Sequence, residues 1–295
     1  MYPRLPILLI FLAATAAACG GTERGSVTDD LGRSLSLPDS VTRVISLAPN
    51  ITEMIYAAGG GGRLVAVSTA DDYPPEVNAL IRLGALPVNF ESIVALEPDL
   101  VLLNAEINQA DDADRLGGLG VPAMILETSS LDGVIEDITT IGELLGTSDR
   151  ATPQARLLRL AVDSLRIRTD SVSRPSVLFL IGFNTLYAFG RDSYINDVIA
   201  AAGGRSITAH LEHNPVLNEE FVIAENPDYI IVAADGSFAP DYLVSSHPSF
   251  ADLTAVKMER VAGINADLVL RPGPRLINGA YQIANIIHSE LFATD

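Results

Sequence analysis

Residues 149–172 of the chain read Asp149-Arg-Ala-Thr-Pro-Gln-Ala-Arg-Leu-Leu-Arg-Leu-Ala-Val-Asp-Ser-Leu-Arg-Ile-Arg-Thr-Asp-Ser-Val172. Aliphatic residues recur in this stretch among arginine, glutamine and aspartate. Glycine is absent, and the one proline, Pro153, stands in the first turn, where proline is tolerated. The pattern predicts a single helix over residues 149–173. At about 1.5 Å per residue such a helix is about 35 Å long, which is enough to connect two lobes.

On both sides of this helix, short β-branched runs alternate with helical patterns, as is typical of α/β units around a largely parallel sheet. Upstream, strands are predicted at residues 44–47, 64–68, 100–103 and 121–126, and helices at 51–58, 91–96 and 131–145. Downstream, strands are predicted at 176–181 and 229–233, and helices at 194–202 and 274–292. The sequence therefore predicts two Rossmann-like α/β lobes, residues 41–148 and 174–295, joined by a single long α-helix.

A repeat supports the similarity of the two halves. The stretch Glu91-Ser-Ile-Val-Ala-Leu-Glu-Pro-Asp-Leu-Val-Leu has the same layout as Glu220-Phe-Val-Ile-Ala-Glu-Asn-Pro-Asp-Tyr-Ile-Ile. In each, a glutamate precedes Pro-Asp by seven residues and opens a short apolar helix before a buried strand. A glutamate in a first turn is stabilised by the positive helix end by about 0.3–1 kcal/mol, so helix stabilisation alone could account for both residues.

The N-terminus has the three parts of an export signal: Arg4, an apolar run over residues 5–14, and small residues at 16–18. The apolar run is too short to span a bilayer comfortably. Cys19, the only cysteine, follows directly, as in a bacterial lipobox, although Ala16 stands where leucine is usual. One thiol cannot form an internal disulfide, so acylation explains it better than an ordinary cleaved signal followed by an idle cysteine. We predict a signal peptide over 1–18 and a lipidated Cys19 with a tether over 19–40.

Composition limits the possible partners. The chain has 19 Lys and Arg against 37 Asp and Glu, which gives a formal net charge of −18 at pH 7. Such a surface repels phosphates, so no nucleic-acid partner is expected. With 48% hydrophobic residues among 295, the chain has enough apolar surface to fill the cores of two lobes.

Patterns for catalysis and metal binding are weak. The chain lacks a Gly-x-Ser-x-Gly elbow, and no cysteine remains inside the fold as a nucleophile. His210 and His213 could meet on one helical turn, but two histidines without further ligands are a weak metal signal. We therefore expect no enzyme activity, no metal site and no cofactor. An exported hydrolase on the same scaffold would need a clustered acid, base and nucleophile, and a sensor could use the same fold.

Four motifs occur in a fixed order along the chain: Arg43-Val-Ile-Ser-Leu-Ala-Pro-Asn-Ile-Thr-Glu-Met-Ile, the loop Asp72-Tyr-Pro-Pro-Glu, the block at 91–102, and Arg271-Pro-Gly-Pro-Arg275. Over residues 41–291 the chain resembles the periplasmic binding proteins for vitamin B12 and ferric siderophores. The resemblance implies a monomeric, lipid-anchored protein of the periplasm or cell surface that serves the permease and ATPase of an ABC importer. Its ligand would be cobalamin or, alternatively, a ferric siderophore or heme.

The resemblance also implies roles for two glutamates. Glu91 and Glu220 correspond to the surface glutamates, one on each lobe, that dock into arginine pockets of the permease. Glu219 adjoins Glu220, so the second assignment could be shifted by one residue. A carboxylate presented on each lobe can form charge-assisted bonds with arginine and align both lobes at once.

The ligand is expected between the lobes, at the loops that follow the strand ends. By the same resemblance, ligand contacts fall at Ala70 and from Asp267 to Arg271. Ala70 is not aromatic and the chain has no tryptophan, so cobalamin and a ferric chelate both remain open, and Tyr73 and Tyr187 are available for heme. Residue types near the predicted strand ends suggest further wall residues: Pro49, Asn50, Asp72, Tyr73, Phe183, Asn184, Tyr187 and Arg191.

Overall fold

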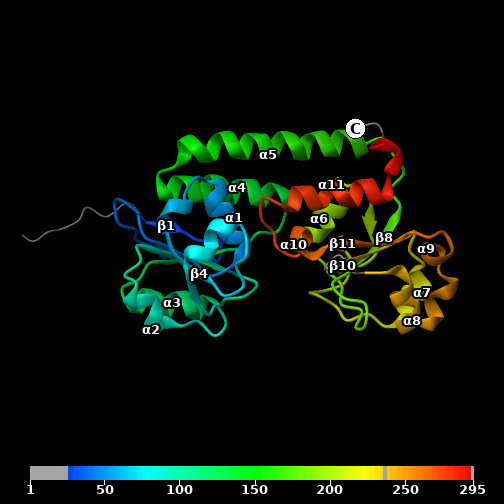
Figure 1. Ribbon diagram of the computed structural model, residues 1–295, viewed down its shortest axis with the longest axis horizontal. Helices are drawn as coiled ribbons and strands as arrows, with labels where there is room; N and C mark the ends of the chain where they lie inside the picture. The colour runs from blue at the N-terminus through cyan, green and yellow to red at the C-terminus, as the bar shows by residue number, and fades with distance from the viewer. Residues whose placement is uncertain (1–25, 235–237, 294–295) are drawn as a thin grey trace, which may run out of the picture.

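The computed structural model describes residues 26–234 and 238–293 as two α/β lobes beneath one long helix (Figure 1). This arrangement confirms the predicted fold class. The predicted signal peptide, 1–18, and Cys19 lie outside the described residues. Within the described part, no helix is both long enough and apolar enough to cross a bilayer.

The N-terminal lobe is built on a parallel sheet with the strand order β5-β4-β3-β6-β7. Its strands are β3 (Val44–Ser46), β4 (Leu64–Ser68), β5 (Ile81–Leu83), β6 (Leu100–Asn104) and β7 (Ala123–Leu126). Strands β3, β6 and β7 are buried along their whole length, which is why they read as continuous apolar runs. The covering helices are α1 (Pro49–Ala57) and α4 (Leu131–Leu145) on one face, and α2 (Phe90–Ala95) and α3 (Ala110–Gly118) on the other, with short 3-10 helices at Gly61–Arg63 and Pro75–Ala79.

The C-terminal lobe repeats this plan with the strand order β11-β10-β8-β9. Its strands are β8 (Ser176–Leu180), β9 (Arg205–Ser206), β10 (Tyr229–Ala234) and β11 (Val261–Asn265). One face carries α6 (Tyr194–Ala201), α10 (Ala266–Val269) and α11 (Leu276–Ile287). The other face carries α7 (Glu219–Glu225), α8 (Pro240–Ser246) and α9 (Thr254–Lys257), with 3-10 helices at Pro248–Asp252 and Ser289–Leu291 completing the lobe.

Helix α5 (Ser148–Thr169) joins the lobes and lies along both of them, above α4 and α11 (Figure 1). Its inner face buries Ala151, Ala155, Val162 and Leu165 in a hydrophobic cluster that includes residues of both lobes. The phenolic hydroxyl of Tyr281, on α11, donates a hydrogen bond of 2.9 Å to the carbonyl of Ala161. The linker is therefore packed against each lobe rather than exposed to solvent on all sides.

The structure differs from the predicted tether over 19–40. Strand β1 (Val27–Thr28) pairs with β2 (Ser34–Leu35), and Leu37 is buried. Between these strands, Asp29 accepts a hydrogen bond from the amide of Ile125 (3.3 Å), and Asp30 accepts one from the amide of Glu127 (2.7 Å). These amides belong to the edge strand β7 and the residue after it, and the two carboxylates satisfy donors that the sheet leaves unpaired. Residues 27–40 are thus part of the N-terminal lobe.

Candidate functional site

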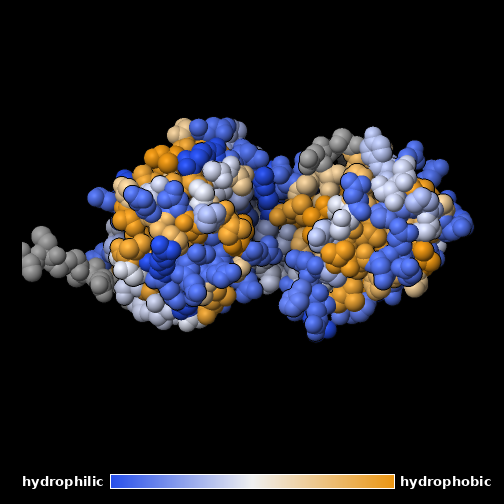
Figure 2. All heavy atoms as spheres, turned by 90° about the horizontal axis from the view of Figure 1, so that it is seen from below, coloured by the Kyte–Doolittle hydropathy of each residue, from blue (hydrophilic) through white to orange (hydrophobic). Residues whose placement is uncertain are grey.

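Loops that follow the parallel strands of one lobe meet those of the other. Asp72, after β4, is ion-paired with Arg271, after β11. The loops after β6 and β7 line a small hollow together with Asp192 and Tyr194 of the C-terminal lobe. Open α/β sheets bind ligands at these strand ends. Figure 2, viewed from the side opposite α5, shows the resulting depression between the lobes.

An aromatic cavity of about 500 Å³ opens on the C-terminal lobe, at the ends of β8 and β10 and the start of α8. The ring of Phe183 stacks on that of Tyr242, with centroids 6.2 Å apart, and is tilted against Phe238 at 5.6 Å. Hydrophobic side chains gather on this side of the depression in Figure 2. The predicted wall residues Phe183, Asn184 and Tyr187 all line the cavity.

The sequence reasoning did not identify Phe238 and Tyr242. Both belong to the segment between β10 and β11, where no hydropathy period marked the seven-residue helix α8. The signal that could have found them is the position of an aromatic-containing segment directly after a buried strand. Together with Phe183 they give the cavity an apolar wall of stacked rings.

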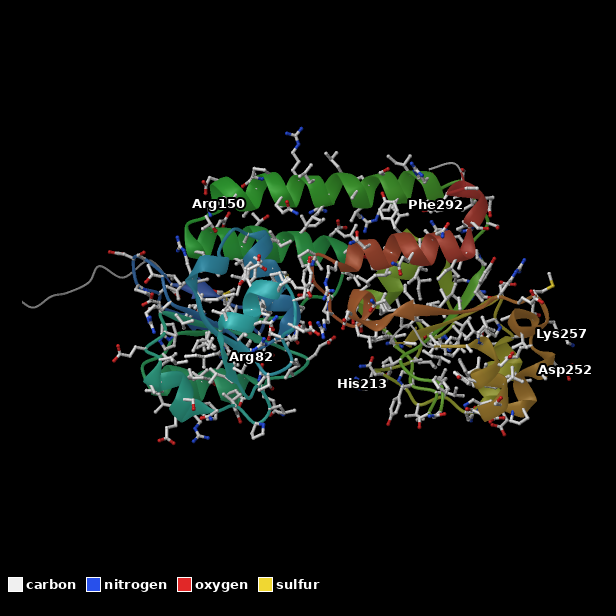
Figure 3. The ribbon with its side chains drawn as sticks, in the orientation of Figure 1. Arg82, Arg150, His213, Asp252, Lys257 and Phe292 are labelled. Atoms are coloured by element: carbon white, nitrogen blue, oxygen red, sulfur yellow. The ribbon has the colours of Figure 1, made fainter. Side chains whose placement is uncertain are left out.

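The loop after β4 belongs to the N-terminal lobe, opposite the aromatic cavity, and hydrogen bonds hold it in place. Arg82, labelled in Figure 3, donates from Nη1 to the carbonyls of Ser68 (3.3 Å) and Asp71. The amide of Ser68 in turn donates to Oδ2 of Asp71 at 2.9 Å. These hydrogen bonds fix the loop on both sides of Ala70. Ala70 is exposed to solvent, and its side chain offers a ligand only a methyl group.

Two arginines of the C-terminal lobe bind carboxylates of the N-terminal lobe. Arg271 donates to both oxygens of Asp72, with Nη2 to Oδ2 at 3.2 Å, and also pairs with Asp267 at 3.1 Å. The hydrogen bond from Arg271 holds the pKa of Asp72 below its ordinary value. The predicted contacts Asp72, Asp267 and Arg271 therefore form one charged cluster across the lobe boundary.

The second arginine, Arg275, makes a deeper contact that the sequence did not suggest. Its Nε and Nη2 donate to the two oxygens of Glu53 at 2.9 and 2.7 Å. Glu53 is only 4% exposed, and burial raises its pKa against the opposing influence of Arg275. The guanidinium also lies 4.2 Å from the ring centroid of Tyr73, a cation–π contact. Tyr73 remains 44% exposed at the edge of this contact.

Three predicted wall residues lie elsewhere. Pro49 and Asn50 begin α1 at the lobe contact, where a Cβ on Gly273 would lie 3.3 Å from the Asn50 carbonyl oxygen. Asn50 is buried and accepts a bond of 3.2 Å from Asn104. Arg191 is exposed and donates to the carbonyl of His210 at 3.2 Å, outside the aromatic cavity. Pro49 and Asn50 are found at the lobe contact because α1 starts directly after β3, and Arg191 is on the surface.

The histidines considered for a metal lie on the segment between β9 and α7. His213, labelled in Figure 3, lies on the C-terminal lobe with a backbone φ of 53°. Among the residues that the structure describes, no group of three or more His, Cys, Asp and Glu side chains is arranged to hold a metal ion. His210 instead lies against the ring of Phe221 at a centroid distance of 6.2 Å.

The two candidate docking glutamates begin helices of similar construction. Asn89 caps α2 by accepting from the amide of Ser92, and Asn218 caps α7 by accepting from the amide of Phe221. Glu91 and Glu220 occupy the first turns and are exposed, and no hydrogen bond or ion pair from the described residues reaches their carboxylates. Both helices lie on the side of the molecule away from α5 (Figure 1).

Glu219 differs from its neighbour. Its carboxylate is engaged by His247 Nδ1 at 2.7 Å and by the hydroxyl of Ser249. These bonds hold the pKa of Glu219 below its ordinary value, with the Ser249 bond as the larger cause. A carboxylate that is already bonded within its own lobe is less available to an external arginine than that of Glu220.

Comparison with known proteins gives consistent matches over most of the chain. Residues 44–268 match the family model described as periplasmic binding protein. An uncharacterized ABC transporter substrate-binding lipoprotein of Bacillus subtilis is 28% identical over 274 residues, which cover 90% of this chain and 86% of that protein.

Two solved structures share the fold at more than 25% identity. The crystal structure of the periplasmic vitamin B12 binding protein of Vibrio cholerae superimposes with a TM-score of 0.75 and 26% identity, covering 86% of this chain and 99% of that one. The apo form of a periplasmic heme-binding protein from Roseiflexus gives a TM-score of 0.74 and 27% identity, covering 85% of this chain and 100% of that one.

Proposed function

Since this chain belongs to the periplasmic binding protein family, we propose that it is the substrate-binding lipoprotein of an ABC importer. In this proposal it holds cobalamin between its lobes and delivers it to the membrane permease. The similarity to the vitamin B12 binding protein of Vibrio cholerae supports the ligand, and the similarity to the lipoprotein of Bacillus subtilis supports the anchor.

The observation that carries the ligand proposal is the charge balance of the site. The aromatic cavity offers stacked, uncharged rings from Phe183 and Tyr242. The two arginines at the lobe boundary, Arg271 and Arg275, already bind carboxylates. A strongly anionic ferric chelate would need cations that are free to bind it, whereas a macrocycle with apolar faces and amide side chains needs a flat apolar wall with a few polar groups. This balance favours a corrinoid.

The test is a titration of the chain from Thr22 onward with cyanocobalamin, a panel of ferric siderophores and hemin, followed by tyrosine fluorescence and calorimetry. We expect submicromolar binding of cyanocobalamin. Tyr242→Ala should weaken it about tenfold, because it removes one ring of the stacked wall. Asp267→Ala and Arg271→Ala should weaken it as well. Phe292→Ala, at the far end of the C-terminal lobe (Figure 3), is the matched control and should change the affinity less than about twofold.

Heme is the second candidate, favoured by two exposed tyrosines. Tyr73 and Tyr187 are 44% and 46% exposed and flank the space between the lobes. A phenolate oxygen is a known axial ligand of heme iron. Tight hemin binding without cyanocobalamin binding would indicate that the protein serves iron uptake. Loss of the hemin absorption shift in Tyr187→Phe or Tyr73→Phe would identify the substituted tyrosine as the axial ligand of the iron.

For docking, we propose Glu91 and Glu220 as the contacts with the permease. Their exposure, the matching construction of α2 and α7, and the engagement of Glu219 elsewhere support this choice. Glu91→Gln and Glu220→Gln should each weaken binding to the importer about tenfold, because a charge-assisted hydrogen bond contributes about 1.5–3 kcal/mol. Glu225→Gln, exposed at the other end of α7, is the control.

For the anchor, we propose acylation of Cys19. Cells that express the wild-type protein should incorporate labelled palmitate into it and retain it in the membrane fraction. Cys19→Ser should lose the label and appear in the soluble fraction, and equal palmitate labelling of both proteins would contradict the proposal.

A further inference from the structure

His247 lies directly after α8, between the wall of the aromatic cavity and the helix that carries Glu220. The residue is only 8% exposed, and its ring stacks on that of Phe250 with centroids 5.1 Å apart. The Nε2 atom is 2.7 Å from the carbonyl oxygen of Phe183, and Nδ1 is 2.7 Å from Oε1 of Glu219. One side chain thus joins the end of β8 to the first turn of α7.

Both neighbours of the ring are hydrogen-bond acceptors. The backbone carbonyl of Phe183 can only accept, and the ionised carboxylate of Glu219 can only accept. The two ring nitrogens of His247 each lie 2.7 Å from one of these acceptors, so a single ring bridges the Phe183 carbonyl and the Glu219 carboxylate. The hydroxyl of Ser249 binds the other oxygen of Glu219 and fixes the carboxylate in this orientation.

At the cavity, α8 is attached to the loop after β8 at two further points. Tyr242, on α8, stacks on Phe183. The hydroxyl of Ser246 donates to Oδ1 of Asn184 at 3.3 Å. A ligand that stacks against Phe183 and Tyr242 therefore acts on the two segments that hold the imidazole ring.

We propose that His247 is a positioning residue that couples occupation of the aromatic cavity to the orientation of the first turn of α7, and so to Glu220. Displacement of the Phe183 carbonyl or of α8 moves the ring, and the ring moves Glu219, whose neighbour is Glu220. The loaded protein would then present its docking carboxylate differently from the empty one. This inference rests on the proposed docking role of Glu220.

The test follows hydrogen exchange at two amides of α7 that are bonded to its cap. Phe221 N donates to the Asn218 side chain at 2.8 Å, and Val222 N donates to the Asn218 carbonyl at 3.4 Å. The internal reference is the equivalent pair in the other lobe, Ser92 N and Ile93 N, which are both bonded to Asn89 at 3.1 Å. Every measurement is expressed relative to this reference.

The first arm needs no ligand. Tyr242→Ala removes the ring that stacks on Phe183, and it should change the exchange of the two α7 amides about threefold in the protein that retains His247. In His247→Phe, which keeps the ring but loses both bonds, adding Tyr242→Ala should have no further effect. An equal effect of Tyr242→Ala in both backgrounds, or no effect in either, would overturn the proposal.

Two further variants, each of which keeps one of the two bonds of His247, distinguish coupling from a simple effect on stability. They also replace His247→Phe in the test if that variant does not fold. His247→Asn keeps a donor near the Nδ1 position, toward Glu219, and His247→Gln keeps one near the Nε2 position, toward Phe183. Coupling requires both bonds, so each variant should lose the response to Tyr242→Ala although it retains one bond. A response that persists in proportion to each variant's stability would identify His247 as a stabilising residue only.

The second arm adds saturating cyanocobalamin to the protein. We expect about threefold slower exchange at the α7 amides with His247 and no change in His247→Phe. If cyanocobalamin does not bind, the corrinoid proposal fails, while the first arm still decides the role of His247. If it binds and slows the α7 amides equally in both proteins, the coupling does not pass through His247 and the inference is overturned.

Discussion

Asp137 on α4 shows how one residue can work against the stability of the fold. Its Oδ2 accepts a hydrogen bond of 2.6 Å from Thr128 Oγ1, but burial raises its pKa to about 6, and Asp30 and Glu136 add to the rise. Because its pKa is higher in the folded state, that state binds the proton more tightly than the unfolded chain does. The resulting stabilisation is fully present below about pH 4 and is lost as the pH rises through about 6.

Asp137→Asn should therefore raise the free energy of unfolding at about pH 8 by about 1–2 kcal/mol and change it little at about pH 4. The amide keeps an acceptor for Thr128 and carries no charge to desolvate. Urea unfolding at the two pH values measures the difference. Glu136→Gln, at the exposed neighbouring position, should shift stability by less than about 0.5 kcal/mol. A loss of stability in Asp137→Asn at about pH 8 would mean that the carboxylate is stabilised as an ion.

The sequence allowed some residues of the site to be predicted and not others. Phe183, Asn184 and Tyr187 could be assigned to a wall because they follow a recognisable strand, and strand ends gather ligands. Glu53 and Arg275 could not, because they are 222 residues apart and stand in two separate motifs of the sequence. No spacing in a single sequence indicates that two such side chains meet across a lobe boundary.

Among the elements, α5 was the easiest to predict and the short ones were the hardest. The absence of glycine over many residues predicted a helix at 149–173, and the structure has it at Ser148–Thr169, with Arg166 and Arg168 in its last turn. The closing helix, expected over 274–292, is divided into α11 and a 3-10 turn at His288. Strands β1 and β2 have two residues each, too few for any periodicity.

Helix α5 also connects the lobes electrostatically. Arg166 pairs with Asp132 of α4 at 2.9 Å and with Asp197 of α6 at 3.4 Å. Asp197 in turn accepts a hydrogen bond from the amide of Leu131 at 2.8 Å, at the start of α4. One guanidinium on the linker thus lies between carboxylates of the N-terminal and C-terminal lobes.

Arg166→Gln should lower the free energy of unfolding by about 1 kcal/mol, a modest value because all three groups are partly solvated. It removes the cation that Asp132 and Asp197 share, while Arg159 still pairs with Asp132. Arg156→Gln, on the exposed face of the same helix, should change stability by less than about 0.5 kcal/mol. Chemical denaturation should also show the difference between the variants shrinking at high salt, because ions screen partly exposed pairs. Equal effects of the two substitutions would assign Arg166 no bridging role.

At the scale of the whole molecule, two ion pairs across the lobe boundary differ in burial. Burial determines how much the loss of each pair changes the free energy of unfolding. The Glu53–Arg275 pair is bidentate with a nearly inaccessible carboxylate, whereas Asp72 in the Asp72–Arg271 pair is exposed. Removing one member of a buried pair leaves an uncompensated charge, which costs about 3–5 kcal/mol, while exposed pairs contribute about 0–1 kcal/mol.

Arg275→Met should therefore destabilise the protein by about 3 kcal/mol, and Asp72→Asn by less than about 1 kcal/mol. The double variant Glu53→Gln with Arg275→Met removes both charges and should recover part of the loss. Thermal or urea unfolding of the four proteins gives the ranking. If the double variant is no more stable than Arg275→Met, the stranded carboxylate is not the cause of the loss.

The same contacts limit how far the lobes can move. Helix α5 is packed along both lobes, a hydrophobic cluster includes residues of α4, α5, α6 and α11, and the Glu53–Arg275 pair joins the lobes. Opening by a large hinge rotation would have to break this packing, so ligand binding should cause only a small rotation.

We expect the radius of gyration from small-angle scattering to differ by less than about 1 Å between the ligand-free and the cyanocobalamin-saturated protein. Arg275→Met should widen that difference because it releases the buried link, whereas Arg156→Gln should not. A change of several ångströms in the wild-type protein would show that α5 bends or unpacks, and would contradict the rigid-linker prediction.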